Sequence, residues 1–151
     1  MYTIVIEQTK AFKKRMKYYP TNHTFVETDF DSLMYIRNFP YPYGWIKETG
    51  TPPQKHLDVI LISDEDYELG VEKELNLIGV FMRDDGDHKL ISVLKENKKV
   101  KDLPDLSTDE LNKLYNLYPE VSNNEGWHGK EKAEIVVDNY LSSINRVDNS
   151  F

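Results

Sequence analysis

The chain has 151 residues, and its 19 basic against 26 acidic side chains give a formal net charge of −7. This length suits one domain with its own core, and the acidic balance argues against nucleic-acid binding, which depends on neutralising phosphates. The sequence has no cysteine, no apolar run near the ~20 residues of a membrane helix and no secretory signal, which argues against disulfide scaffolds, cysteine chemistry and membrane spans. We therefore expect a cytoplasmic protein.

The first two thirds of the chain predict β-structure. Short apolar or β-branched segments bounded by polar residues are typical of strands. Gly86 lies between the last two such segments and allows a tight turn, so we expect these two to form a hairpin. The proline- and aromatic-rich segment 39–45 predicts a rigid irregular stretch packed over an edge of the core. The strand candidates are residues 2–7, 24–27, 57–62, 75–82 and 89–94.

Two segments concentrate charge of one sign. Residues 10–17 hold five basic side chains in eight positions, and residues 64–74 hold six acidic ones. Segments of this kind are usually solvated surface that steers folding or association. The alternative is that the basic segment faces an anionic ligand, and the sequence alone leaves both interpretations open.

The last third of the chain predicts two helices. Ser107 begins a capping-box pattern at the start of the first helix, and Pro119 ends it. Apolar residues at helical spacing predict a second helix from about Lys130. Strands first and helices last indicate an α+β fold, in which a curled antiparallel sheet or small barrel is flanked by two helices. We expect a single domain over residues 1–146 and a frayed tail over residues 147–151.

Carboxylates supply the clearest chemistry that the residue pattern suggests. The four histidines show no metal-ligand spacing, and the common phosphate-binding and nucleophile motifs are absent from the sequence. Asp58 begins a strand that is expected to be buried, where an unpaired carboxylate is costly. Asp84, Asp85 and Asp87 crowd one turn, and a hard cation such as Mg²⁺ would relieve their repulsion. The alternative is that they simply form a good hairpin turn, because Asp-Gly is a common turn dipeptide.

Several short motifs follow one another in a definite order along the chain. They include the segment Phe39-Pro40-Tyr41-Pro42-Tyr43-Gly44-Trp45-Ile46, the stretch His56-Leu57-Asp58-Val59, and the turn Asp85-Gly86-Asp87-His88-Lys89. Others are residues 77–81, 102–106 and 117–118, Trp127 and residues 133–136. Each motif alone is weak, but the ordered set is specific. Over roughly residues 24–144 it resembles the soluble (family I) inorganic pyrophosphatases.

This resemblance implies an OB-like five-stranded β-barrel with two flanking helices and assembly into homo-oligomers. It also implies Mg²⁺-dependent hydrolysis of diphosphate or another phosphorylated small molecule. Matched position by position, Asp58 and Asp87 correspond to metal ligands. Asp85 corresponds to a third ligand by unbroken spacing, and Asp84 takes that place if one residue is deleted earlier.

The resemblance also implies residues that contact the substrate. Lys89 matches a lysine that contacts phosphate, and Tyr43 and Tyr118 match tyrosines near the metal and phosphate. Lys55 is a further candidate for a phosphate contact. Glu7 corresponds to an acidic residue on the first strand of the family.

The chain departs from the family pattern at positions that matter for catalysis. Pro53 and Lys55 replace the first two aspartates of the signature, the second of which helps to hold and deprotonate the attacking water, and Pro119 replaces a lysine. An ammonium at position 55 would compete with a metal ion for the same place. One hypothesis is a divergent hydrolase with weakened activity, with another acid such as Glu48 as the base. The other is a non-catalytic phosphate-binding, metal-binding or assembly module.

Overall fold

The computed structural model describes residues 1–149, and the side chains of residues 1–144. Within this range the strands are β1 (Tyr2–Gln8), β2 (Lys14–Tyr19), β3 (Thr24–Asp31), β4 (Tyr43–Ile46), β5 (Asp58–Leu61), β6 (Glu72–Met82), β7 (Lys89–Leu94) and β8 (Gly126–Gly129). The α-helices are α1 (Leu33–Ile36), α2 (Thr108–Leu117) and α3 (Lys130–Asn149), and the short 3-10 helices are η1 (Lys47–Thr49) and η2 (Leu103–Asp105). Among the described helices, none combines the length and the apolar character that crossing a bilayer requires.

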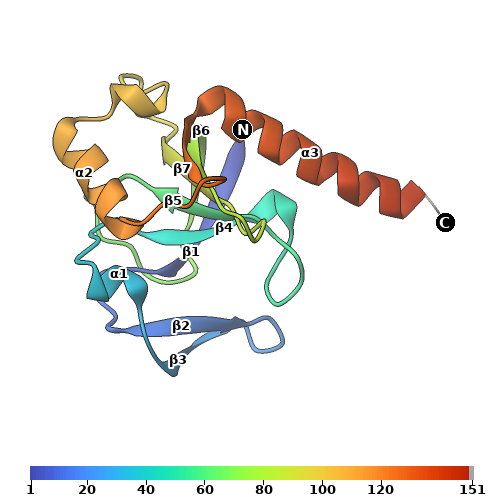
Figure 1. Ribbon diagram of the computed structural model, residues 1–151. Coiled ribbons are helices and arrows are strands. Elements are labelled where there is room, and N and C mark those ends of the chain that lie inside the picture. Colours follow the sequence, from blue (N-terminus) through green and yellow to red (C-terminus); the bar gives the residue numbers. More distant parts are fainter. Residues whose placement is uncertain (150–151) are drawn as a thin grey trace.

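Five of the described strands close into a barrel. They follow the order β1-β4-β5-β7-β6, and β6 pairs back with β1. These pairs are antiparallel except for β5 and β7, which run parallel. β8 extends the sheet beyond β6, while β2 and β3 form a separate hairpin alongside the barrel (Figure 1). The expected α+β fold with an OB-like barrel is therefore confirmed. The described residues form one short helix, α1, in addition to the two expected helices.

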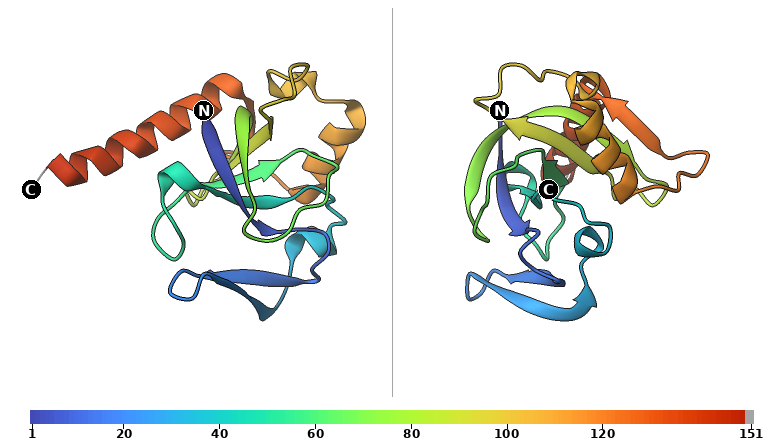
Figure 2. Two further views of the ribbon diagram at one scale, coloured as in Figure 1. Left: turned by 180° about the vertical axis from the view of Figure 1, so that it is seen from behind. Right: turned by 90° about the vertical axis from the view of Figure 1, so that its left-hand side faces the viewer.

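The strand β5 is apolar on both of its faces because each face meets a different core. Val59 and Leu61 belong to a buried cluster that includes residues of α3, whereas Ile60 belongs to a second cluster that includes residues of α2. The left view of Figure 2 shows α2 and α3 on different sides of the barrel. The continuous apolar run in the sequence thus reflects a strand covered on both sides.

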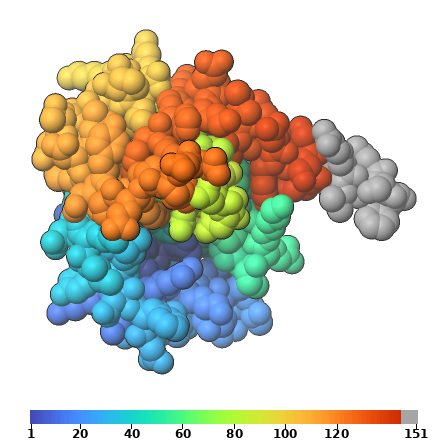
Figure 3. Space-filling view, in the orientation of Figure 1, coloured from blue at the N-terminus to red at the C-terminus, as the bar shows by residue number. Residues whose placement is uncertain are grey.

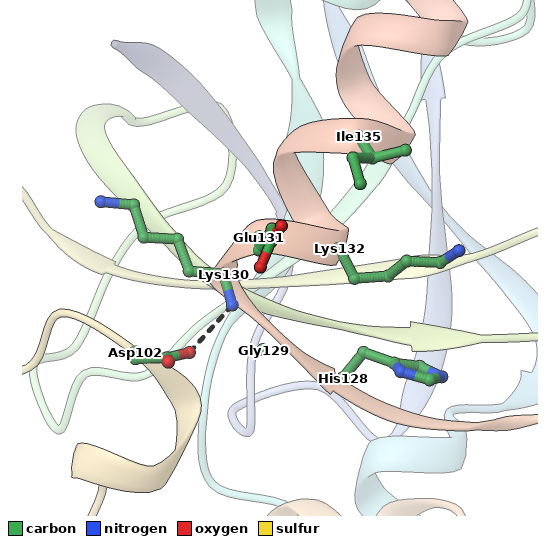
Figure 4. A pocket seen from close by; sticks show the side chains of 7 residues that line it. All are labelled: Asp102, His128, Gly129, Lys130, Glu131, Lys132 and Ile135. Carbon is green, nitrogen blue, oxygen red and sulfur yellow. Dashed lines mark hydrogen bonds between the residues drawn. The ribbon is translucent and has the colours of Figure 1, made fainter.

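The two long helices begin where the sequence predicts. Ser107 Oγ accepts a hydrogen bond from the backbone N–H of Glu110 at 3.1 Å, and the Glu110 carboxylate accepts the Ser107 N–H at 2.9 Å. At the start of α3 the Lys130 N–H donates to Asp102 Oδ1 at 2.9 Å (Figure 4). α3 continues to residue 149, so of the predicted tail 147–151 the last two residues lie outside the described range.

Short elements show where local patterns fail. Residues 39–42 lie outside helices and strands, as expected for the segment 39–45, but Tyr43–Ile46 form the strand β4, so the expectation is wrong for residues 43–45. A Cβ at Gly44 would lie 1.9 Å from the backbone oxygen of Val5, so glycine is what lets β4 pair this closely with β1. The basic segment 10–17 also contains most of β2, a strand that the sequence does not predict.

Candidate active site

The register of the barrel brings candidate residues to one face of the sheet. Asp58 lies opposite Lys89 in the parallel pair of β5 and β7, and Trp45 lies opposite Asp58 in the pair of β4 and β5. Residues opposite each other in paired strands project from the same face, and so does a residue two positions along the same strand. Tyr43 therefore shares the face of Trp45, and four residues from the three strands β4, β5 and β7 lie on one face of the sheet.

Lys89 is the centre of a set of polar and charged side chains on this face. We call this set the Lys89 cluster (Glu7, Tyr43, His56, Asp58, Asp87 and Lys89). The Lys89 ammonium donates hydrogen bonds to Asp58 Oδ2 at 2.7 Å, to Asp87 Oδ2 at 3.0 Å and to the Tyr43 hydroxyl at 3.1 Å. Its side chain is 7% exposed. Burial acts to lower the pKa of Lys89, but the charge and hydrogen bond of Asp58 raise it above its ordinary value. The amine therefore stays charged at neutral pH.

His56 holds the other oxygen of Asp58. Its Nε2 lies 3.1 Å from Asp58 Oδ1, and its Nδ1 lies 2.7 Å from the backbone oxygen of Gln54. Because a carbonyl and an ionised carboxylate only accept hydrogen bonds, this arrangement suits the protonated imidazole, which donates from both ring nitrogens. The hydrogen bond to Asp58 raises the pKa of His56, and burial acts in the opposite direction.

The environment of Asp58 keeps this carboxylate ionised. Burial acts to raise the pKa of Asp58, but the hydrogen bonds of His56 and Lys89 and the charge of Lys89 hold it well below its usual range. Sequence reasoning gave His56 no role. The available signal was its spacing, because a residue two positions before Asp58 projects from the same side of an extended chain.

Glu7 is a second carboxyl beside Asp58. Burial, followed by the negative charge of Asp58, raises the pKa of Glu7 to about 7, while the charges of His56, Arg15 and Lys89 act to lower it. The cluster therefore joins one firmly ionised carboxylate to one that exchanges its proton near neutral pH. Glu7 comes from β1.

The two candidate tyrosines differ in their contacts. Burial, followed by the charge of Asp58, raises the pKa of Tyr43 well above its ordinary value, so its hydroxyl keeps its proton. Tyr118 stacks on Phe81 with the ring centroids 4.6 Å apart and the planes 2° from parallel, and the Arg83 guanidinium lies over the Tyr118 ring at 5.5 Å. Tyr118 thus lies in an aromatic stack, whereas Tyr43 binds Lys89 directly.

The aspartates of the β6–β7 turn also divide into different roles. Asp87 binds Lys89, whereas Asp85 Oδ1 accepts the backbone N–H of Asp87 at 2.9 Å and so supports the turn itself. Asp84 accepts a hydrogen bond from Ser122 Oγ. In Figure 3 this turn, in yellow-green, lies on the surface between the orange 115–128 region and the blue β2–β3 hairpin. The structure thus brings Asp87 to the cluster and engages Asp84 and Asp85 elsewhere.

The two other candidates have partners outside the Lys89 cluster. The Lys55 ammonium lies 5.6 Å from the ring centroid of Tyr140 on α3. One carboxylate oxygen of Glu48 accepts the backbone N–H of Thr3 at 2.7 Å. Both side chains therefore tie the 47–57 region to neighbouring elements.

The carboxylates fit Mg²⁺ in one specific way. Among the described residues, no three His, Asp or Glu side chains lie close enough together to hold a metal ion by themselves. Mg²⁺ usually binds through one or two carboxylates together with substrate phosphates and waters. Asp58 and Asp87, which Lys89 already joins, fit that smaller role. The residues present therefore suit Mg²⁺ that arrives with a phosphate group.

Comparisons with known proteins agree with this fold. An inorganic pyrophosphatase of Helicobacter pylori is 26% identical over 130 residues, which are 75% of each chain. One of Malacoplasma penetrans is 34% identical over 86 residues, which are 53% of this chain and 48% of that protein. The crystal structure of an inorganic pyrophosphatase from Neisseria gonorrhoeae has a TM-score of 0.73 at 23% identity, over 95% of this chain and 90% of that one. The sequence model of inorganic pyrophosphatases matches residues 4–145, and the chain belongs to that family.

Proposed function

We propose that the protein binds diphosphate or a related phosphoanhydride at the Lys89 cluster and hydrolyses it slowly in the presence of Mg²⁺. The buried Lys89 ammonium and the half-buried His56, on either side of Asp58, carry this proposal. Charged donors with a protonated tyrosine hydroxyl beside them are suited to phosphate oxygens. As the family resemblance implies, we place this activity in the cytoplasm and in a homo-oligomer.

Five of the six residues of the cluster then have a role at the reacting groups. Lys89 and Tyr43 bind phosphate oxygens, and Asp58 and Asp87 hold Mg²⁺, which when bound neutralises and polarises those oxygens. Glu7 accepts the proton of the attacking water, because a carboxyl with a pKa of about 7 suits a general base at neutral pH. Glu48, the base suggested by the sequence, is instead held by the backbone of β1. The reaction is slow because Lys55 stands where the family has an aspartate that helps to hold and deprotonate the attacking water.

Phosphate release from diphosphate with Mg²⁺ tests this proposal. We expect kcat below about 1 s⁻¹, the low end of typical enzymes. Lys89→Met should abolish the release of phosphate, because it removes the ammonium that donates hydrogen bonds to Tyr43, Asp58 and Asp87. The control is Lys95→Met, which removes a surface lysine paired with Glu74 at 2.9 Å and should change nothing. Turnover well above 1 s⁻¹, or release that survives Lys89→Met, would contradict the proposal.

The alternative is a non-catalytic module that binds phosphate without cleaving it. Lys55 favours this alternative, because its ammonium stands where the family has a carboxylate. Its position over the Tyr140 ring stabilises the ammonium there. The non-hydrolysable analogue methylenediphosphonate separates the two functions. If it raises the melting temperature in the presence of Mg²⁺ while diphosphate yields no phosphate, the non-catalytic function is correct.

A further inference from the structure

Arg83 lies on the same face of the sheet as Lys89. Phe81 is opposite Lys89 in the antiparallel pair of β6 and β7, and Arg83 follows Phe81 by two positions. Residues opposite each other share a face, and so do residues two positions apart in an extended chain. The same register, continued into the turn, sets Arg83 opposite Asp87, whose carboxylate binds Lys89 at 3.0 Å. Arg83 therefore adjoins the Lys89 cluster on the side of the β6–β7 turn.

Tyr118 lies between these two cations. The Arg83 guanidinium lies over the Tyr118 ring, 5.5 Å from its centroid, and Phe81 stacks on the same ring. Burial raises the pKa of Tyr118, while the charges of Lys89 and Arg83 both act to lower it. Two positive charges from different elements thus lie near one tyrosine hydroxyl. Like charges repel, so this arrangement favours an anion that both can bind.

The hydrogen-bond donors of Arg83 are available to such an anion. The nearest carboxylate oxygen among the described residues is Asp85 Oδ2, which lies 3.8 Å from Nη2 and so beyond hydrogen-bond distance. Asp85 is 58% exposed, so water screens its charge. Stacking on a ring leaves the N–H groups at the edge of the guanidinium plane free. Two of them can bind a phosphate group in parallel.

Hydrogen bonds at the turn hold Arg83 in this position. The Glu125 carboxylate accepts the backbone N–H of Asp84 at 3.2 Å and that of Ser122 at 3.4 Å, which joins the turn to the segment after α2. The backbone N–H of Arg83 donates to His88 Nδ1 at 2.9 Å. A cation that is fixed before its ligand arrives loses little conformational entropy on binding.

We propose that Arg83 binds the second phosphate group of the substrate, so that the site extends from Lys89 along the β6–β7 turn to Arg83. The proposal rests on the proposed function, because Lys89 holds the first phosphate group. Residues two positions apart along a strand are separated by about 7 Å. The long side chains of Lys89 and Arg83 span that separation and can converge on the two ends of one diphosphate.

Calorimetry with Mg²⁺ present tests this proposal with two non-hydrolysable ligands. Methylenediphosphonate has two phosphonate groups, and methylphosphonate has one. We expect Arg83→Met to weaken the binding of methylenediphosphonate at least about tenfold, because it removes a charged hydrogen-bond donor. The same variant should change the affinity for methylphosphonate less than about twofold, because Lys89 holds a single group without Arg83.

Lys113→Met is the matched control. The Lys113 ammonium lies 5.7 Å from the ring centroid of Tyr41 and 2.8 Å from a carboxylate oxygen of Asp109, so it is also a cation over a tyrosine ring beside an acid. Because Lys113 lies outside the Lys89 cluster, its loss should leave both affinities unchanged. Arg83→Lys keeps the charge but not the paired donors, so its affinity for methylenediphosphonate should lie between those of Arg83→Met and the wild type.

The outcomes separate this proposal from the proposed function. If Arg83→Met binds both ligands as tightly as the wild type while Lys89→Met binds neither, the role of Arg83 is wrong and the phosphate site stands. If Arg83→Met weakens both ligands equally, Arg83 does not serve the second group and the proposal is wrong. If Arg83→Met loses methylenediphosphonate but Lys89→Met keeps it, Arg83 binds phosphate and the proposed function is wrong.

Folding of the variants is checked by their melting temperatures. The Arg83 side chain is 31% exposed, so its replacement leaves no buried gap. If Arg83→Met nevertheless melts well below the wild type, Arg83→Lys decides, and an unchanged affinity of that variant for methylenediphosphonate would overturn the paired hydrogen bonds of Arg83.

Discussion

The charge pair of Asp58 and Lys89 is buried, and burial decides what its loss costs. Removing one partner of a buried ion pair leaves the other charge without compensation. Asp58→Asn keeps the shape of the side chain, and we expect it to lower the free energy of unfolding by about 3 kcal/mol. Urea denaturation at pH 7 measures this loss. Glu74→Gln breaks the exposed pair with Lys95 and should cost much less, so equal losses would show that burial is not the cause.

The raised pKa of Glu7 predicts a stability that depends on pH. The carboxyl ionises near its ordinary pKa of 4.5 when unfolded but at about 7 when folded, so ionisation destabilises the fold as pH rises between these values. The raised pKa of His56 acts in the same direction, because its stabilisation is present below 6.5 and is lost at higher pH. Glu7→Gln should therefore stabilise the protein by about 2 kcal/mol more at pH 8 than at pH 5.

Denaturation of the wild-type protein and of Glu7→Gln in EDTA, at pH 5 and at pH 8, measures this difference in stability. EDTA matters because a bound cation would itself favour the ionised form of Glu7. The control is Glu27→Gln, which removes an exposed carboxyl of β3. A gain from Glu7→Gln that is the same at pH 5 and pH 8 would mean that Glu7 is not the group that titrates.

Local pattern and register explain which site residues could be predicted from the sequence. Asp58, Asp87 and Lys89 stand in short motifs that resemble those of the family, so the sequence singles them out as candidates. Their hydrogen bonds, and the place of His56, depend on which strands are neighbours, and no local pattern contains that information. The choice between Asp84 and Asp85 stays open in the sequence because a single deletion changes it.

At the scale of elements, the sequence predicts the helices and strands that a short, local pattern of residues specifies. β7 begins and ends at the predicted residues 89–94, and α2 begins with the predicted capping box. β2 is missed because five of its six residues are charged or aromatic and it pairs with β3 outside the barrel. β4 is missed because prolines and aromatics precede it, and its pairing on both sides supplies the stability that its own sequence does not predict.

Gly44 shows how closely β4 and β1 approach. A methyl group at this position would meet the backbone oxygen of Val5, and backbone atoms cannot move aside as a side chain can. We expect Gly44→Ala to destabilise the protein by about 3 kcal/mol or to prevent folding. Gly126→Ala in β8 is the matched control, because the nearest atom to its Cβ would lie at 3.8 Å. Thermal denaturation of both variants tests this, and equal melting temperatures would contradict the close approach.

At the scale of the whole molecule, the positions at which the chain departs from the family pattern lie apart from the two buried clusters. Pro53, Lys55 and Pro119 are all exposed, whereas the two buried clusters are built from other residues. Packing therefore sets no strong limit on what stands at these three positions. The barrel can therefore keep the positions of Asp58, Asp87 and Lys89 whichever side chains stand at these three positions.

This separation predicts that activity can be restored without redesigning the core. The variant Pro53→Asp, Lys55→Asp and Pro119→Lys returns the three charges of the family pattern. We expect it to release phosphate from diphosphate with Mg²⁺ at least about 100-fold faster than the wild type, because groups that activate the nucleophile contribute about 10²–10⁴ in rate. The control variant Pro53→Asn, Lys55→Asn and Pro119→Gln makes the same backbone changes without the charges. If both variants fold, as circular dichroism would show, and the charged one is no faster than the neutral one, then the cluster around Lys89 has lost more than those three side chains. In that case we would infer that the barrel only binds its ligand, because the three charges of the family pattern would be present again together with Asp58, Asp87 and Lys89, and still without hydrolysis.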